Sequence, residues 1–194
     1  MHYYYTKYPY LNYNYRDTDG WHKMFSIPPE MLATEFEKTF HQPPKSFFDC
    51  GAATGVIVRR AQRLGMDAWG IDVKKYPYMD TEELFKSGKI QIKSILDCDP
   101  IHADIVYCNG TLTYFTESEL PRVLDKFKIA KSLFAIHNTT EDVVAARQNG
   151  DELTTCSKPR LIKPREWWME TFNKNGFTSK YINSLQCFCA IPQR

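Results

Sequence analysis

The chain has 194 residues, of which 43% are hydrophobic and 25% are charged. This length suits one domain with a substantial core, and the composition excludes a wholly disordered chain. A formal net charge of +2 gives no general argument for a nucleic-acid partner. Because no apolar run approaches the roughly 20 residues that span a bilayer, and because the start does not resemble a signal peptide, we expect a cytoplasmic protein without a membrane segment.

The first 40 residues differ in composition from the rest of the chain. Seven tyrosines fall within residues 3–15. From Pro29 to Phe40, a proline at the start and apolar residues at helical spacing predict a short helix, and Pro43-Pro44 then interrupts the chain. We therefore expect a tyrosine-rich N-terminal cap or lid at residues 1–40 and a main domain at residues 41–194.

Beyond residue 45, segments typical of buried strands alternate with segments typical of helices. Such alternation indicates a parallel sheet that is covered on both faces, and right-handed crossovers make it doubly wound. We predict an α/β fold, namely a doubly wound, mostly parallel seven-stranded sheet with a C-terminal antiparallel hairpin. The strands are expected at 46–50, 68–73, 89–96, 103–108, 132–137, 177–182 and 185–191, and the intervening helices at 56–64, 81–87, 117–128 and 164–175.

The most informative motif, Asp49-Cys50-Gly51-Ala52-Ala53-Thr54-Gly55, directly follows the first strand. Ligands of doubly wound sheets bind beyond the carboxyl ends of the strands. Glycines and alanines let the backbone turn sharply and let a ligand approach the main chain without meeting a side chain. The next helix also begins with free N–H groups, which suit a carboxylate or a phosphate.

Asp72 ends the second strand, 17 residues after Gly55. A carboxylate at this place can accept hydrogen bonds from both hydroxyls of a ribose. The strand, the small-residue loop, the helix and the acid together predict a nucleotide site. The alternative is a tight strand-to-helix turn with a solvated Asp72.

A dinucleotide site would have the pattern G-x-G-x-x-G, whereas the loop has G-x-A-x-G after an acid. In this form the sequence resembles the class I S-adenosylmethionine (SAM)-dependent methyltransferases, from about Phe47 to the C-terminus. Further matching segments are 70–73, 96–97, 103–108 and 167–177. The resemblance implies a Rossmann-like fold, SAM as the cofactor and methyl transfer as the activity. The chain departs from the family pattern at Ala53, where the middle glycine is replaced, and at Cys50.

The resemblance also implies a division of labour among the residues that bind SAM. The loop would lie against the methionine part, with Asp49 attracting the ammonium group, and Asp72 would bind the ribose. Segments after the second, third and fourth strands would contact the adenine and flank the sulfonium. The implied cofactor residues are Asp49, Cys50, Gly51, Ala52, Ala53, Gly55, Asp72, Val73, Asp97, Cys98, Asn109, Gly110 and Thr111.

Methyl transfer from a sulfonium mainly requires that the acceptor is aligned with the methyl group. Where a general base is needed, His137 is the best candidate, because it ends the fifth strand on the same rim. A structural histidine is the alternative. Aromatic side chains would contact the acceptor, or else pack on the sheet or form a protein interface. The candidates are Tyr13, Tyr15, Trp21 and Tyr114.

The sequence leaves the acceptor open, with a small molecule favoured over a protein or a nucleic acid. Alternatives to a methyltransferase are a SAM-binding protein with other chemistry, such as SAM degradation, and a catalytically silent module that kept the fold. An NAD-dependent oxidoreductase is disfavoured by the loop spacing. We expect no metal, because the cysteines form no CxxC pair and favour buried free thiols. They are Cys50, Cys98, Cys108, Cys156, Cys187 and Cys189.

Overall fold

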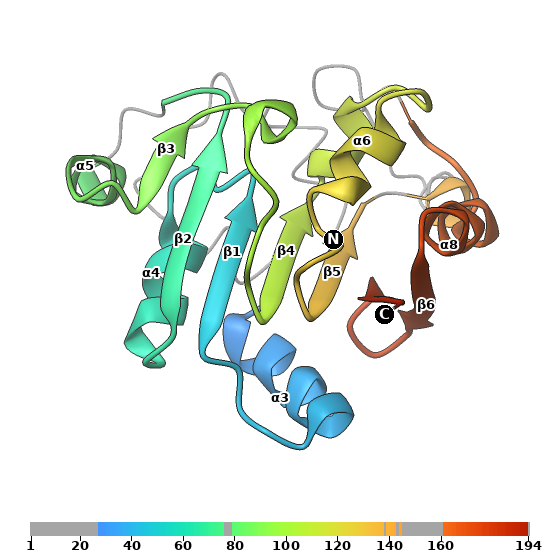
Figure 1. Ribbon diagram of the computed structural model, residues 1–194, viewed down its shortest axis with the longest axis horizontal. Coiled ribbons are helices and arrows are strands. Elements are labelled where there is room, and N and C mark those ends of the chain that lie inside the picture. The colour runs from blue at the N-terminus through green and yellow to red at the C-terminus, as the bar shows by residue number, and fades with distance from the viewer. Residues whose placement is uncertain (1–26, 76–78, 138, 143, 145–160, 194) are drawn as a thin grey trace.

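The structure is a computed structural model that describes residues 27–75, 79–137, 139–142, 144 and 161–193. These residues form a seven-stranded sheet with the order β3-β2-β1-β4-β5-β7-β6 (Figure 1). Only β7 runs antiparallel to its neighbours, β5 and β6. The predicted fold class is therefore confirmed. The strands are β1 (Ser46–Cys50), β2 (Asp67–Asp72), β3 (Ile90–Ile92), β4 (Ile105–Asn109), β5 (Ser132–Ile136), β6 (Phe177–Ile182) and β7 (Cys187–Pro192).

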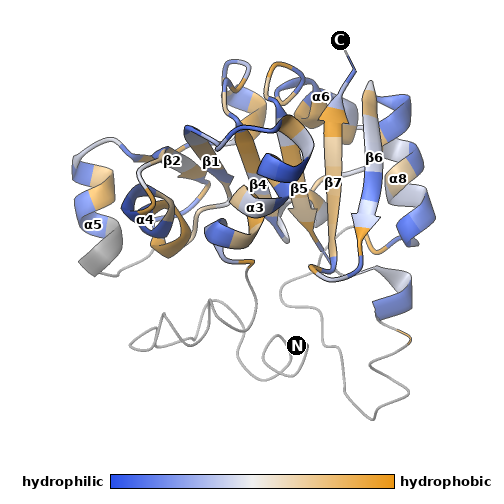
Figure 2. Cartoon of the chain, turned by 90° about the horizontal axis from the view of Figure 1, so that it is seen from below, coloured by the Kyte–Doolittle hydropathy of each residue, from blue (hydrophilic) through white to orange (hydrophobic). Residues whose placement is uncertain are grey.

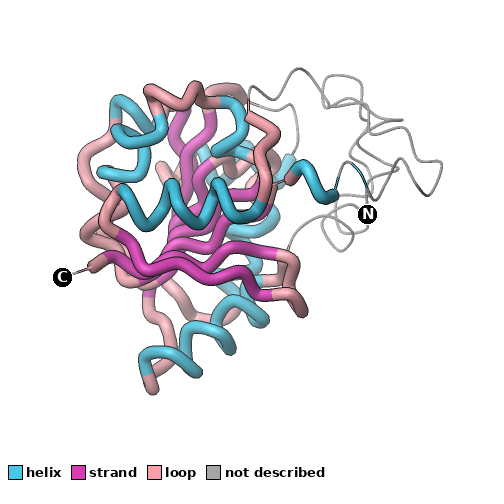
Figure 3. Tube along the Cα trace, turned by 90° about the vertical axis from the view of Figure 1, so that its right-hand side faces the viewer, coloured by secondary structure: helices cyan, strands magenta, loops and turns pink. Residues whose placement is uncertain are grey.

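Helices cover both faces of the sheet (Figure 3). One face is packed by α3 (Pro29–Phe40), α4 (Val56–Arg63) and α5 (Met79–Lys86), which contribute side chains such as Phe36 and Val58 to one apolar cluster. The other face is packed by α6 (Leu120–Asp125) and α8 (Arg165–Lys174), which contribute Leu124 and Trp168 to a second cluster. Burial of both faces explains why the central strands are almost continuously apolar.

The described part of the predicted N-terminal segment packs directly on the sheet. Helix α3 begins at Pro29, whose fixed φ suits a first turn, and ends at Phe40, after which His41 adopts the left-handed conformation. Its buried Leu32 and Phe36 lie in the same cluster as Phe47 of β1. Just before the helix, the Ile27 N–H donates to the Tyr107 hydroxyl at 3.0 Å. Residues 1–26, on which the lid prediction rests, lie outside the described residues.

The two strands of the C-terminal hairpin differ in polarity (Figure 2). Strand β7 is hydrophobic, and Cys187, Phe188, Cys189 and Ala190 are buried. Strand β6 carries polar residues such as Thr178 and Lys180 on its exposed side. Because β6 is the edge of the sheet, its polar side chains oppose pairing with another chain.

Two predicted elements are shorter in the structure than the sequence suggested. The third strand, expected at 89–96, ends at Ile92, and a 3₁₀ helix η2 (Ile95–Asp97) follows, because the Ser94 hydroxyl accepts the Leu96 N–H. The helix expected at 117–128 is α6, preceded by a 3₁₀ helix η3 (Thr111–Tyr114). Just before α6, the Glu119 carboxylate accepts both the Thr116 N–H and the Thr116 hydroxyl at 2.8 Å.

The amino-terminal ends of three parallel strands are joined through Asp104. Its carboxylate accepts the backbone N–H groups of Lys45 at 2.6 Å and Ser46 at 3.2 Å, and it pairs with the Lys131 ammonium at 2.8 Å. The Ser132 hydroxyl donates to the Asp104 carbonyl at 2.8 Å. This network fixes the starts of β1, β4 and β5 relative to one another.

Five of the six cysteines lie in described segments, and all five are free and buried. They are Cys50, Cys98, Cys108, Cys187 and Cys189. Within those segments, no group of three or more histidine, cysteine or acidic side chains is arranged to hold a metal ion. No helix in the described ranges has both the length and the apolar character needed to cross a bilayer.

Candidate functional site

The predicted loop joins β1 to α4 through three residues with positive φ. Gly51 has φ of 89°, Ala53 of 46° and Gly55 of 75°. The Gly51 and Ala52 N–H groups both donate to the Ile71 carbonyl at 2.9 Å, so the loop bends back over the end of β2. Ala53 adopts this conformation despite its methyl group, which costs about 1–2 kcal/mol for a residue other than glycine.

Asp72, at the end of β2, reaches the loop. Its Oδ2 accepts the Ala53 N–H at 2.8 Å, and its Oδ1 accepts the Lys74 N–H at 3.0 Å. The side chain is buried, with 7% of the residue exposed. Burial raises the pKa of Asp72 above its usual value, although the backbone donors oppose this shift. Each carboxylate oxygen has a second lone pair, so both can accept a further hydrogen bond.

Asp49 is the second carboxyl group at this rim, and only 3% of the residue is exposed. Burial, and then the nearby charge of Asp72, raise the pKa of Asp49 to about 8. Within the described residues, no hydrogen bond or ion pair to the Asp49 carboxyl is present. The Asp49 carboxyl is therefore mostly protonated at neutral pH. A cation that bound here could displace the proton of Asp49.

Two exposed apolar side chains stand beside Asp72. Val73 is 75% exposed, and Ile92 is 50% exposed and lies in register with Asp72 on the neighbouring strand. Ile92 was not among the residues predicted for the site. The available signal was its position at the end of the third parallel strand, because all such ends share one rim. Asp97 and Cys98 follow in and after η2, with Asp97 exposed and Cys98 buried.

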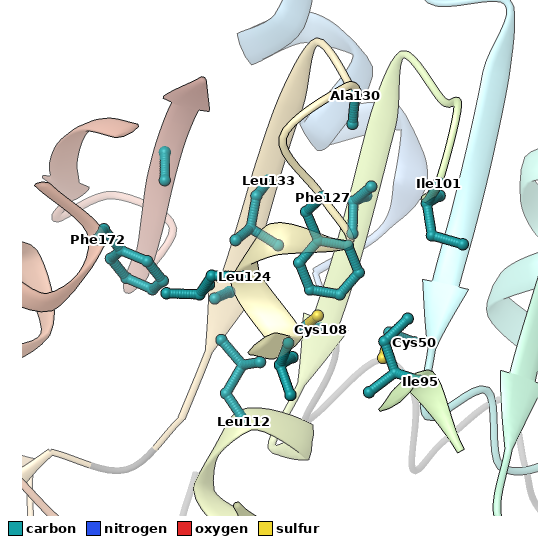
Figure 4. Packing of buried hydrophobic residues seen from close by; sticks show 14 of the residues in the cluster. Cys50, Ile95, Ile101, Cys108, Leu112, Leu124, Phe127, Ala130, Leu133 and Phe172 are labelled. Atoms are coloured by element: carbon teal, nitrogen blue, oxygen red, sulfur yellow. The ribbon is translucent and has the colours of Figure 1, made fainter. Parts of the chain in front are cut away.

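The end of β4 approaches the loop from the other side. Gly110 has φ of 73°, and its N–H donates to the Ile136 carbonyl at 2.7 Å. The Thr111 hydroxyl donates to the Cys50 carbonyl at 2.6 Å. Cys50, Cys108 and Leu112 belong to one packed apolar cluster (Figure 4). The start of the loop is therefore packed against the apolar core.

The glycines of the loop make the sharp turn that the sequence suggested, and packing also requires them. A Cβ at Gly51 would overlap with Thr111 Oγ1, and one at Gly55 would lie 2.5 Å from Ile90 Cδ1 and 2.6 Å from Leu84 Cδ1. At both positions the space is filled by side chains of the protein. Glycine is therefore required there by packing and by positive φ.

His137 follows β5, and its ring is enclosed by aromatic side chains. The ring lies 3.9 Å from that of Trp168 and stacks on Phe188 at 4.7 Å, measured between centroids. Neither ring nitrogen has a hydrogen-bond partner among the described residues. Burial, only partly opposed by the charge of Asp142, lowers the pKa of His137 to about 3. The imidazole is therefore neutral and weakly basic, and its role as a base stays a prediction.

The predicted acceptor contacts are only partly within the described residues. Tyr114 ends η3 and is 41% exposed. Tyr13, Tyr15 and Trp21 lie outside the described residues. The structure thus gathers the predicted cofactor residues at the carboxyl ends of β1, β2 and β4 and in η2. It puts His137 at the end of β5, and the roles of all these residues in binding remain predictions.

No protein-family model and no curated protein matches the sequence. Solved structures do match. The sugar N-methyltransferase KedS8 from Streptoalloteichus has a TM-score of 0.67 at 12% identity, over 88% of this chain and 88% of that one. The chain has the Rossmann-like methyltransferase fold.

Two further neighbours of this fold were solved with S-adenosylhomocysteine (SAH) bound. The 1,6-didemethyltoxoflavin-N1-methyltransferase of Burkholderia thailandensis has a TM-score of 0.59 at 12% identity, over 84% of this chain and 77% of that one. The magnesium protoporphyrin IX methyltransferase of Synechocystis has a TM-score of 0.58 at 12% identity, over 84% and 81%. At these identities the likeness establishes the methyltransferase fold, and the function has to be argued from the site.

Proposed function

We propose that the protein is a SAM-dependent methyltransferase that acts on a small molecule. The observation that carries this proposal is the 2.8 Å hydrogen bond from the Ala53 N–H to Asp72 Oδ2. It joins the loop after β1 to the acid after β2, the two elements that an adenosine site of this fold requires. The bound SAH in two structural neighbours supports the same ligand.

The chemistry of the rim fits SAM. The buried Asp49 carboxyl lacks a fixed cation, which suits the ammonium of the methionine part. Asp72 has spare lone pairs for two ribose hydroxyls, and Val73 and Ile92 offer exposed apolar surface for an adenine ring. Asp97 is exposed and can accept from an exocyclic amine.

When it is bound, SAM supplies an activated methyl group on a positively charged sulfur. The task of this chain is to orient the donor and to align an acceptor with it. The rigid loop and Asp72 orient the donor. Tyr114, at the adjacent rim, offers an exposed phenol to an acceptor. His137 is proposed as the general base where the methyl acceptor must lose a proton. Its low pKa makes it a weak base.

The preference for a small acceptor rests on the neighbours. The three described above are named for a toxoflavin precursor, a sugar and a magnesium porphyrin. We also propose a cytoplasmic location, because five buried free thiols suit a reducing compartment.

One observation favours a second candidate, a SAM-binding module without methyl transfer. His137 is the candidate base, and with a pKa of about 3 it is a poor one at neutral pH. Such a module would bind SAM and SAH through the same residues but would consume no SAM with any acceptor.

Calorimetry with SAM, SAH and NAD tests the proposal. We expect SAM and SAH to bind and NAD not to bind. Incubation with SAM alone and with a panel of small nucleophiles, followed by mass spectrometry, then separates transfer from degradation and from silent binding. Binding of NAD alone, or of none of the three, contradicts the proposal. Binding without any turnover supports the silent module.

A further inference from the structure

The side chain of Thr111 is hydrogen-bonded to the backbone at the start of the loop. Its hydroxyl donates to the Cys50 carbonyl at 2.6 Å, and the alternative acceptor, the Asn109 carbonyl, is more distant at 3.5 Å. The carbonyl that it holds belongs to the residue just before Gly51. The side chain also fills the space that a Cβ at Gly51 would need. Thr111 therefore interlocks with the first turn of the loop by a hydrogen bond and by shape.

We infer that Thr111 is a positioning residue for the cofactor loop and that it acts through Cys50 and Gly51, not by contact with the cofactor. This inference rests on the proposed function. The resemblance to the family implied that Thr111 flanks the sulfonium. The hydrogen that its hydroxyl could donate there is instead used on the Cys50 carbonyl.

The loop is held from both sides by this arrangement. Asp72 holds the Ala53 N–H at 2.8 Å from the side of β2, and Thr111 holds the Cys50 carbonyl from the side of β4. Between these two anchors, Gly51 and Ala53 have φ of 89° and 46°. A backbone with positive φ at two of three successive residues is uncommon in a flexible chain. A loop that is already held in this conformation loses less entropy when a ligand binds.

Two substitutions of Thr111 separate its hydroxyl from its shape. Thr111→Val keeps the shape and removes the hydroxyl, whereas Thr111→Ser keeps the hydroxyl. Thr113 offers a matched control, because it lies in the same 3₁₀ helix and its hydroxyl donates to the Gly110 carbonyl at 2.7 Å. Thr113→Val therefore removes a comparable hydrogen bond that does not reach the loop.

The experiment measures SAH affinity by calorimetry, melting temperature, and amide hydrogen exchange of residues 51–53 in the full chain. We expect Thr111→Val to weaken SAH binding about fivefold to tenfold, as the loss of one buried hydrogen bond would, and to speed exchange in the loop. Thr111→Ser and Thr113→Val should bind SAH within twofold of the wild type and leave loop exchange unchanged.

Other outcomes overturn the inference. If Thr113→Val weakens binding as much as Thr111→Val, the effect is general destabilisation. If Thr111→Ser loses SAH affinity and speeds loop exchange as much as Thr111→Val does, the hydroxyl does not hold the loop. If the wild type binds no SAH, the proposed function fails. Loop exchange still decides the inference in that case, because faster exchange in Thr111→Val alone supports the anchor and unchanged exchange refutes it.

Discussion

A buried carboxyl group at the amino ends of the parallel strands differs from one at their carboxyl ends in its partners and in the direction of its pKa shift. At the amino ends, Asp104 accepts two backbone N–H groups and the Lys131 ammonium. Although burial opposes it, Lys131 and these donors lower the pKa of Asp104. At the carboxyl ends, Asp49 has no such partner among the described residues, and burial raises its pKa to about 8.

We propose that this difference separates a group that stabilises the fold from a group that binds a ligand. A buried polar group without a partner lowers the stability of the fold, so such groups occur mainly at functional sites. Asp104 connects strands and is satisfied by the protein. Asp49 lies at the edge where ligands of this fold bind, and its missing partner is the one that a cationic ligand would supply.

The largest expected effect is on the free energy of unfolding, from a substitution at the amino ends of the strands. Asp104→Ala leaves the N–H groups of Lys45 and Ser46 and the Lys131 ammonium without their acceptor, so we expect a loss of about 2 kcal/mol or more in the free energy of unfolding. Urea denaturation measures this loss. SAH affinity should stay within twofold at a temperature where the variant is folded. A loss below about 0.5 kcal/mol would show that Asp104 is not the connection that we describe.

The next effect concerns the pH dependence of stability. Folded Asp49 keeps its proton up to pH of about 8, whereas the unfolded chain releases it near pH 4. The unfolded state therefore binds fewer protons in this window, and stability falls as pH rises from about 4 to 8. Asp49→Asn removes this contribution. The variant should gain at least about 1 kcal/mol relative to the wild type between pH 5 and pH 8, as measured by urea denaturation.

Asp104 should show the opposite dependence. Its pKa is lowered in the folded state, so its contribution is present above its usual pKa and is lost as pH falls. Parallel stability curves for the wild type and Asp49→Asn from pH 5 to pH 8 would mean that Asp49 is ionised in the fold, and the comparison between the two edges would then fail.

The smallest expected effect is the number of protons that are released when SAH binds. If the ammonium of SAH takes the place of the Asp49 proton, binding at pH 7 should release about one proton, and binding above pH 9 almost none. Calorimetry in buffers of different ionisation enthalpy measures this number. Asp49→Asn should release none at either pH. Equal release by the variant and the wild type would assign the proton to another group.

Local signals were sufficient to predict most of the fold. Helix α3 and strands β1 and β6 have the predicted bounds, because prolines, glycines and short apolar runs mark their ends. The end of β3 was missed, because a strand pattern and the Ser94 cap of η2 compete over the same residues. The helix expected at 117–128 is shorter at both ends, and a turn closed by Thr116 and Glu119 precedes it.

For the site, the sequence predicted which strand ends meet but not what the side chains do there. The contact of Asp72 with the loop follows from the order of the strands. The Thr111–Cys50 hydrogen bond depends on the register of β4 against β1, which no local pattern reveals. The burial of His137 depends on Trp168 and Phe188, which reach it from α8 and β7.

The most direct test of the account compares two carboxylates on the same strand. Asp72 ends β2 at the loop, whereas Asp67 begins β2 and pairs with Lys89 at the exposed opposite end. Calorimetric titration of Asp72→Ala and Asp67→Ala with SAH should show at least a tenfold loss of affinity for the first variant, about 1.4 kcal/mol, and less than twofold for the second. An unchanged affinity of Asp72→Ala, or an equal loss in both variants, would contradict the claim that the loop and Asp72 together bind an adenosine.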